Sequence, residues 1–293
     1  MEQSFLAWLR GRTGPLPRVA IGIGDDAAVV DIPANHQLVS TSDQIIDRVD
    51  FLLDQHEPAR IGHKALCINL SDIAAMGATP HHAIVTLSLP ERNATQTAAA
   101  VYEGILTAAQ QYGVSIAGGD ISVYDGPLAI SVTLNGFVPT GKAWLRSGAM
   151  DGDEILVTGP LGGSLLGRHL DVVPRCDLVA RIRDQISVNA AMDISDGLSL
   201  DLDRLCAASS IGALLDVDAI PIHDDAVSRA RETGKTPIAH ALSDGEDFEL
   251  LLVVSPDTAQ QLMQMDLGTT LSRIGTCTGR TGLWQKTADG KLH

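Results

Sequence analysis

PARIGHKALCINLSDIAAMGATPHHAIVTLSL, residues 58–89, is the stretch that decides the fold of this chain. Its first part, 58–76, begins with a proline and has Ala65, Ile68 and Asp72 at helical spacing, which predicts a helix. Its last part, 83–89, is rich in Val, Ile, Leu and Thr with partial alternation, which predicts a strand. A helix followed closely by a strand is typical of an α/β domain.

The residues on either side continue this pattern. Further strands are expected at 39–42 and 128–138, and a second helix at 94–112. Residues 139–142, Pro-Thr-Gly-Lys, have the composition of a linker between domains. The segment before this linker therefore predicts one α/β domain with its own sheet.

A second series of elements follows the linker. A strand is expected at 154–158, then the glycine-rich segment GPLGGSLLG, residues 159–167, with a helix after it. Another helix is expected at 196–208 and another strand at 249–255. We predict an α/β (α+β) fold with mixed sheets in two domains, residues 1–139 and 140–293.

Composition and charge limit the class of protein. The chain has 293 residues, 45% hydrophobic and 19% charged, so two domains with real cores are possible. A net charge of −15 argues against nucleic-acid binding, and it would repel ATP unless the carboxylates first bind metal ions. No run approaches the ~20 apolar residues of a membrane helix. With no signal-peptide pattern and no C-x-x-C pair, we expect a reduced, cytoplasmic protein outside the membrane.

Aspartates recur at turn-like positions and are the strongest chemical signal. For any single aspartate a turn or helix cap is the better interpretation, because the carboxylate can accept a hydrogen bond from nearby backbone amides. Asp72, however, shares a helical face with Ala65 and Ile68, where an unpaired carboxylate would be costly to bury. Thr41, Ser42 and Asp43 offer three successive oxygen ligands of the kind that Mg²⁺ prefers.

The sequence has no standard nucleotide loop. Gly234-Lys235-Thr236 matches only the end of a Walker A loop, because Arg229 stands where the first glycine is required. The segment 159–167 could offer helix N-terminal amides to a phosphate. Tight packing between a strand and a helix explains these glycines equally well, so both interpretations stay open.

Seven short motifs, in order, resemble those of the thiamine-monophosphate kinases, members of the aminoimidazole-ribonucleotide-synthetase-like superfamily. Together they span nearly the whole chain. They are GIGDDAAVV (22–30), STSDQII (40–46), ALCINLSDIAAMGATP (65–80), IAGGD (116–120), GFVPTGKAWLRSGAMDGDEILVTGPLG (136–162), MDISDGLSLDL (192–202) and LSDGEDFELLL (242–252).

The resemblance implies a fold and a set of site residues. The N-terminal sheet would pair across a homodimer, and the nucleotide and several magnesium ions would lie between the domains near the dimer interface. The positions that match magnesium binding are Asp26, Thr41, Ser42, Asp43, Asp72, Asp120, Asp193 and Asp196. Those that match ATP binding are Gly119, Asp120, Arg146 and Ser195, and those that match the acceptor are Asp50 and Glu246.

The implied reaction is ATP-dependent phosphorylation of thiamine monophosphate to thiamine diphosphate by direct in-line transfer. The acceptor phosphate has a second pKa of about 6 and is largely ionised at neutral pH, so no residue is assigned as nucleophile or general base. Magnesium ions would offset the repulsion between the two anions.

Three departures from the family pattern concern the acceptor. The family usually has a histidine where this chain has Asp50, its C-terminal aromatic tail is missing here, and the segment between GGSLLGRHL and MDISDGL is short. Two alternatives therefore stay open. One is a degenerate, non-catalytic protein that binds ATP and Mg²⁺, and the other is an ATP-dependent enzyme of the superfamily with a different acceptor.

Overall fold

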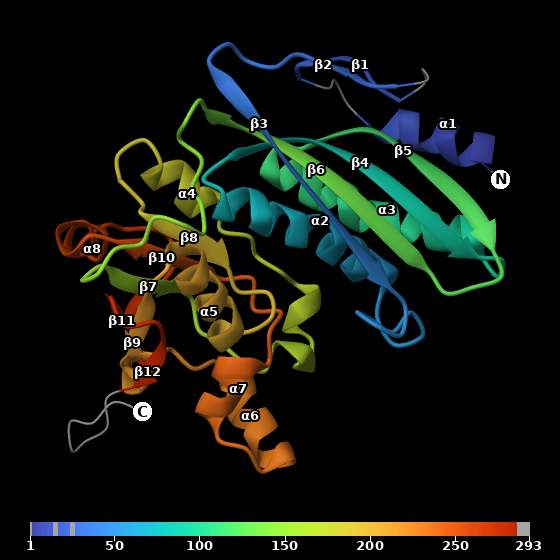
Figure 1. Cartoon of the computed structure of the whole chain (residues 1–293). Helices are drawn as coiled ribbons and strands as arrows, with labels where there is room; N and C mark the ends of the chain where they lie inside the picture. The colour runs from blue at the N-terminus through green and yellow to red at the C-terminus, as the bar shows by residue number, and fades with distance from the viewer. Residues whose placement is uncertain (1, 14–16, 24–26, 286–293) are drawn as a thin grey trace. The chain divides into compact units, whose positions relative to one another are not determined.

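The computed structural model describes residues 2–13, 17–23 and 27–285, and these residues form two compact units (Figure 1). Unit 1 comprises Met1–Ile73, Ala78–Lys142 and Leu170–Val172, and unit 2 comprises Ala74–Gly77, Ala143–His169 and Val173–His293. Each unit combines helices with a sheet, so the predicted two-domain α/β class is confirmed. The boundary between residues 139 and 140 stays a prediction.

Unit 1 is built on a mixed four-stranded sheet in the order β3-β6-β4-β5. Strands β4 and β5 are parallel, whereas β6 runs antiparallel to both of its neighbours. A separate antiparallel pair, β1-β2, precedes this sheet. In chain order the elements are α1 (Glu2–Arg12), β1 (Val19–Ile21), β2 (Val29–Val30), β3 (His36–Ile46), α2 (Pro58–Ala75), β4 (Thr79–Pro90), α3 (Ala94–Tyr112), β5 (Ser115–Tyr124) and β6 (Ala129–Pro139).

Helices α2 and α3 cover one face of this sheet (Figure 1). The face below them carries fully buried residues such as Val85, Leu87 and Val132. The helices approach closely because two glycines meet at their crossing. A Cβ atom on Gly62 would lie 1.9 Å from a carbonyl oxygen of α3, and one on Gly104 would lie 1.7 Å from a carbonyl oxygen of α2. The Ala- and Gly-rich composition thus sets the spacing of the helical layer.

Unit 2 contains a six-stranded sheet in the order β12-β9-β11-β7-β10-β8, parallel only between β12 and β9. Its core includes Val157, Leu202 and Leu251. The strands are β7 (Glu154–Thr158), β8 (Ala190–Asp193), β9 (Gly212–Leu215), β10 (Leu250–Val254), β11 (Leu271–Thr278) and β12 (Gly282–Gln285). The helices are α4 (Cys176–Ile182), α5 (Leu198–Ser209), α6 (Asp224–Thr233), α7 (Pro237–Ser243) and α8 (Pro256–Leu262), with 3₁₀ turns η1 (Ser164–Leu166), η2 (Arg168–Leu170) and η3 (Val217–Ala219).

The elements predicted from strong periodicity are present, with their ends moved by a few residues. Within and immediately after the glycine-rich segment 159–167 only the short turns η1 and η2 form, and the helix predicted after it is α4, which begins at Cys176. Gly162, Gly163 and Gly167 all have positive φ values, so the chain turns repeatedly where a helix would need regular dihedrals. Among residues 2–13, 17–23 and 27–285, none of the helices combines the length and apolar character that a membrane crossing requires.

Candidate active site

Two aspartates from different elements meet on the helix-covered face of the unit 1 sheet. Alternation along β3 turns Thr41 and Asp43 toward α2, which carries Asp72. The Thr41 hydroxyl donates a hydrogen bond to Asp72 Oδ2 over 2.5 Å. The Asp43 carboxyl also shares a hydrogen bond with Asp72. Burial, together with the charge of Asp72 and this hydrogen bond, raises the pKa of Asp43 to about 6.

This acid pair suits a cation. No Lys, Arg or His side chain in the described part of the chain forms an ion pair with Asp43 or Asp72. Two carboxylates and the Thr41 hydroxyl are the hard oxygen ligands that Mg²⁺ prefers. The same described residues contain no group of three or more His, Cys, Asp or Glu side chains placed to hold a metal ion. The pair therefore provides part of a metal site.

Asp120 and Ser42 lie on the opposite, uncovered face of the same sheet. Asp120 on β5 is exposed and pairs in register with Thr86 on β4. Ser42 lies between Thr41 and Asp43 on β3, and its hydroxyl contacts Thr133 Oγ1 at 3.0 Å. Asp43 and Asp120 each lie inside a strand whose pairing continues beyond them.

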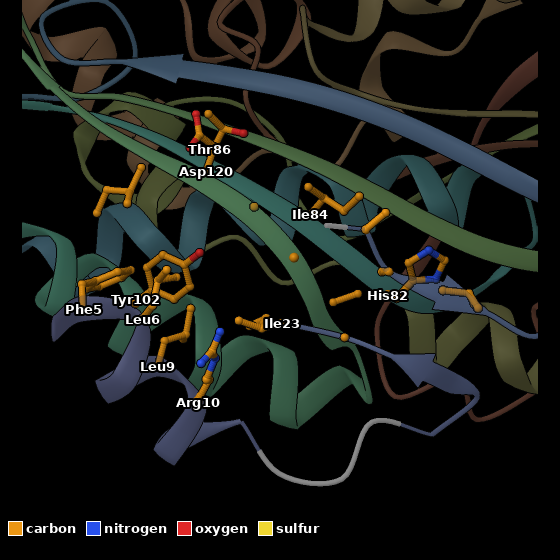
Figure 2. A pocket seen from close by; sticks show the side chains of 18 residues that line it. Phe5, Leu6, Leu9, Arg10, Ile23, His82, Ile84, Thr86, Tyr102 and Asp120 are labelled. Carbon is orange, nitrogen blue, oxygen red and sulfur yellow. The ribbon is translucent and has the colours of Figure 1, made fainter. Parts of the chain in front are cut away.

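A cavity of about 750 Å³ in unit 1 includes Gly119 and Asp120 in its wall. Figure 2 shows Thr86 and Asp120 together in one part of this wall, while side chains of α1 and α3, including Phe5, Leu9 and Tyr102, form another part. Arg10 also lines the cavity. Among the described residues that line it, the cavity thus joins a largely apolar region to a polar region that contains the Asp120 carboxylate.

The backbone near Gly119 approaches β4 very closely. A Cβ atom at Gly119 would lie 1.9 Å from the Val85 carbonyl oxygen, so only glycine fits there. The pairing of β4 with β5 also shifts register just before this point, where Ala117 is the extra residue. This bulge decides which β5 side chains face the cavity.

Asp50 lies in the tight loop that leads from β3 to α2. Its carboxylate Oδ2 accepts a hydrogen bond from the Ile46 amide over 2.7 Å. Its carbonyl oxygen accepts one from Lys64 Nζ over 3.0 Å. The next residue, Phe51, is buried. The loop is therefore fixed at the residue that the sequence assigns to the acceptor.

In unit 2, the predicted residues Asp193, Ser195 and Asp196 lie where β8 leads into α5. Asp193 is buried at the end of β8, and Asp196 is exposed. The carboxylate of Asp201 accepts hydrogen bonds from three successive amides, those of Ser195, Asp196 and Gly197, over 2.9–3.1 Å. Arg204 forms ion pairs with both Asp196 and Asp201. These contacts hold the predicted residues in one rigid turn.

The loop with Glu246 lies against this turn. The Glu246 amide donates to the Ser195 carbonyl over 2.7 Å, and the Phe248 amide donates to the Ile194 carbonyl over 2.8 Å. Glu246 and Phe248 have φ values of 53° and 51°, a strained conformation for residues other than glycine. The structure therefore brings two predicted residues, Ser195 and Glu246, together within unit 2.

The glycine-rich segment 159–167 anchors the same loop instead of presenting free amides. The Gly162 amide donates to both carboxylate oxygens of Asp247 over 3.0 Å, and the Gly163 amide donates to Asp244 over 3.0 Å. Cβ atoms at these glycines would clash with backbone atoms of α7 and α6. Of the two interpretations of this segment, tight packing is therefore correct.

The remaining predicted residues make fewer contacts. Arg146 is exposed, and its carbonyl oxygen accepts a hydrogen bond from the Ser209 hydroxyl over 3.1 Å. Asp26 lies outside the described residues. None of the residues predicted to bind metal or substrate is tested individually by these observations, and all of them stay predictions.

Sequence reasoning missed two parts of the site. The wall formed by α1 and α3 includes Phe5 and Tyr102, whose rings are in edge contact with centroids 5.2 Å apart. Asn69, on α2, accepts a hydrogen bond from the Asp43 amide over 3.2 Å. A signal for Asn69 existed, because an Asn inside an apolar helix needs a buried partner.

Both units match known domains. Residues 24–138 match the AIR synthase related protein, N-terminal domain, and residues 163–283 match the AIR synthase related protein, C-terminal domain. The fold and the acidic site thus define an AIR synthase-related protein.

Three known proteins narrow this class. A thiamine-monophosphate kinase of Rhodopirellula baltica is 55% identical over 300 residues, covering 100% of this chain and 94% of that protein. The crystal structure of thiamine-monophosphate kinase from Stenotrophomonas maltophilia is 33% identical with a TM-score of 0.81, covering 98% of this chain and 96% of that one. AaThiL complexed with AMPPCP and TMP is 30% identical with a TM-score of 0.78, covering 92% and 88%. The chain belongs to the thiamine-monophosphate kinase family.

Proposed function

We propose that this chain phosphorylates thiamine monophosphate to thiamine diphosphate with ATP as the phosphoryl donor. The observation that carries the proposal is the half-buried pair of Asp43 and Asp72, for which the described residues provide no balancing cation. Full-length similarity to a thiamine-monophosphate kinase supports the acceptor, and similarity to a structure with AMPPCP and TMP supports both substrates.

Magnesium is the cation that this site fits best. Asp43, Asp72 and Thr41 would hold it through oxygen atoms, and the other predicted ligands stay proposals. When bound, Mg²⁺ would neutralise phosphate charge and so lower the repulsion between donor and acceptor. The hydrogen bond from Thr41 keeps the Asp72 carboxylate oriented toward β3, and Asn69 keeps the backbone of β3 in place at Asp43.

The cavity beside β5 is the proposed nucleotide site. Its aromatic and aliphatic part, with Phe5, Leu9 and Tyr102, suits a purine ring, because such sites bury most of a flat apolar ligand. Its polar part contains Gly119 and Asp120, the predicted ATP-binding residues. Burial and the neighbouring His81 lower the pKa of His82, so this ring in the cavity wall is neutral near pH 7.

The transfer itself needs orientation more than proton chemistry. An oxygen of the acceptor phosphate forms the new bond to the γ-phosphorus as the bond to the β–γ bridging oxygen breaks, and ADP leaves. The acceptor oxygen is already ionised at neutral pH, so we assign no general base. Asp50 and Glu246 are proposed to contact the acceptor, and Arg146 and Ser195 the nucleotide.

A homodimer is proposed for the uncovered face of the unit 1 sheet. This face carries exposed Leu38 and Ile84 among small polar residues, and an uncovered sheet face with apolar side chains is a common interaction surface. Sedimentation equilibrium of the wild type and of Leu38→Asp would test it, because the variant should be monomeric. The predicted cytoplasmic location stays a prediction.

The proposed activity can be tested with one assay. Purified chain, ATP and Mg²⁺ would be incubated with and without thiamine monophosphate, and both ADP and thiamine diphosphate would be measured. The proposal requires equal amounts of the two products and no ADP without the acceptor. ATP binding without turnover would instead favour the degenerate binding protein, and ADP release with another phosphate monoester would favour a different acceptor.

A further inference from the structure

A row of polar side chains fastens the edge strand β3 to helix α2. Lys64, Asn69 and Asp72 follow one another along α2, and their partners Asp50, Asp43 and Thr41 follow in the reverse order in the segment from β3 to α2. Asn69 is 0% exposed and Lys64 only 1%. We call these three α2 side chains the polar seam.

Asn69 makes two hydrogen bonds in the middle of the seam. Its Oδ1 accepts from the Asp43 amide over 3.2 Å, and its Nδ2 donates to the Ala65 carbonyl over 3.0 Å. Because β3 is an edge strand, the outward amide of Asp43 has no neighbouring strand as a partner, and Asn69 takes this place. Asn is a weak helix former, and a buried amide is stable only when it is hydrogen-bonded.

Lys64 holds the other end of the seam. Its buried ammonium group donates to the Asp50 carbonyl over 3.0 Å. The loop at this point is tight: Arg48 has a φ of 71°, and the Asp50 carboxylate accepts from the Ile46 amide. An ammonium group is costly to bury, so a lysine at this position needs oxygen acceptors such as the Asp50 carbonyl.

We propose that Asn69 and Lys64 are positioning residues, Asn69 for the metal-binding end of β3 and Lys64 for the acceptor loop. This inference rests on the proposed kinase function. Asn69 fixes the backbone of Asp43 and thereby the distance between the Asp43 and Asp72 carboxylates. Lys64 fixes the backbone of Asp50 and thereby the direction of its side chain.

A purely structural role predicts a different result. Replacing one partner of a buried hydrogen bond leaves the other partner unsatisfied and lowers the stability of the fold by about 1–3 kcal/mol. If the seam only held the fold together, Asn69→Leu and Lys64→Met would change the melting temperature and leave the substrate and metal constants alone. If the seam positions the site, Asn69→Leu changes the Mg²⁺ dependence and Lys64→Met changes the KM for thiamine monophosphate.

The test is steady-state kinetics on the full chain, varying Mg²⁺ and thiamine monophosphate separately. Asn69→Leu should raise the Mg²⁺ concentration for half-maximal rate by about 10–100-fold, as for groups that orient metal ligands. Its KM for thiamine monophosphate at saturating Mg²⁺ should not change. Lys64→Met should raise this KM and leave the Mg²⁺ dependence unchanged, and Lys64→Arg, which keeps the charge, should recover part of the loss.

The matched control is Ile105→Val, which removes one methyl group from a fully buried position on α3. It should lower the free energy of unfolding of the same unit by about 1 kcal/mol without changing a seam residue. The Mg²⁺ dependence and the KM for thiamine monophosphate should both stay unchanged. If Asn69→Leu behaves like this control, or if both seam variants change the same constant, the inference is wrong.

A second measurement does not depend on turnover. Mg²⁺ should raise the melting temperature of the wild type and of Ile105→Val. It should raise the melting temperature of Asn69→Leu much less. If Asn69→Leu folds poorly, Asn69→Ala should show the same lost response. A wild type that responds to Mg²⁺ but makes no thiamine diphosphate would refute the proposed kinase activity and would still test the role of Asn69. A normal Mg²⁺ response in both Asn69 variants would overturn that role.

Discussion

Two aspartates of this molecule, the buried Asp247 and the half-buried Asp43, both have a pKa raised to about 6 by burial, but their charged neighbours differ. Burial raises the pKa of Asp247 in unit 2 to about 6, although Arg168 opposes the shift. Burial also raises the pKa of Asp43 in unit 1 to about 6, and there the neighbour, Asp72, adds to the shift. The difference teaches that burial of an acid alone does not mark a functional site, whereas an acid without a balancing charge among the described residues is a candidate for one.

Two acids close to Asp247 in sequence also have side-chain partners within unit 2. Glu249 is buried beside Arg175 and accepts a hydrogen bond from the Thr158 hydroxyl over 2.5 Å. Asp244 contacts the ring of His240 at 2.8 Å. Unit 2 thus supplies side-chain partners for these acids, whereas the described residues of unit 1 supply no ion-pair partner for Asp43 or Asp72.

The largest expected effect comes from breaking the unbalanced pair. Asp43→Asn should lower the rate of thiamine diphosphate formation by about 10³-fold or more, as when a group that stabilises the transition state is removed. The fold should remain, as judged by circular dichroism. Asp54→Asn, an exposed acid in the following loop, is the control and should keep normal activity. Near-normal turnover of Asp43→Asn at limiting Mg²⁺ would disprove the metal assignment.

The next effect concerns stability in unit 2. Arg175→Leu should leave Glu249 buried without its ion pair and lower the free energy of unfolding by about 3 kcal/mol. Urea unfolding would measure this loss. The control is Arg60→Leu, which breaks an exposed ion pair with Asp171 and should cost less than about 1 kcal/mol. If both variants lost the same free energy of unfolding, the buried ion pair would contribute no more to stability than the exposed one.

A smaller effect is expected at Glu246, the acid of this loop that is assigned to the acceptor. Glu246→Gln should raise the KM for thiamine monophosphate by about tenfold, the value of one charged hydrogen bond. Nucleotide affinity, measured by calorimetry, should stay the same. A changed nucleotide affinity with an unchanged KM for thiamine monophosphate would instead assign Glu246 to nucleotide binding.

The smallest effect is a pH dependence of stability without metal. The Asp43 carboxyl has a folded-state pKa of about 6 and an unfolded value near 3.8, so the folded state binds an extra proton between these values. The contribution of Asp43 to stability therefore falls as pH rises from 4 to 6. Asp43→Asn should melt a few degrees above the wild type at pH 8 and equally at pH 4. Saturating Mg²⁺ at pH 8 should remove or reverse this difference, and a difference that is independent of pH would contradict the assignment.

Much of the fold of unit 1 could be predicted from the sequence. The strand with Thr41 and the helices α2 and α3 have strong periodicity, and α3 is observed at Ala94–Tyr112, as predicted. Strand β5 was missed, because Gly118 and Gly119 interrupt its apolar pattern. These glycines serve the close approach to β4, a long-range contact that local patterns do not report.

The candidate site was predictable as a set of residues but not as an arrangement. Spacing along α2 indicated that Asp72 faces the core, and the structure adds Asp43 and Thr41 beside it. That Asp120 lies on the other face of the sheet depends on the bulge at Ala117, which shifts its register. The side of a strand on which a residue lies changes with a single-residue shift, so no motif could give it.

Gly62 and Gly104, where α2 and α3 cross, link the position of the site on α2 to the distance between the two helices. Helix α2 carries the polar seam, and its distance from α3 is set by two positions that have no side chain. A methyl group at Gly104 would clash with the backbone of α2 and force the two helices apart. A misplacement of catalytic groups by about 1 Å can lower the rate by about 10²-fold. A substitution at this crossing is therefore expected to change the rate through the position of α2, although neither glycine is among the residues assigned to the site.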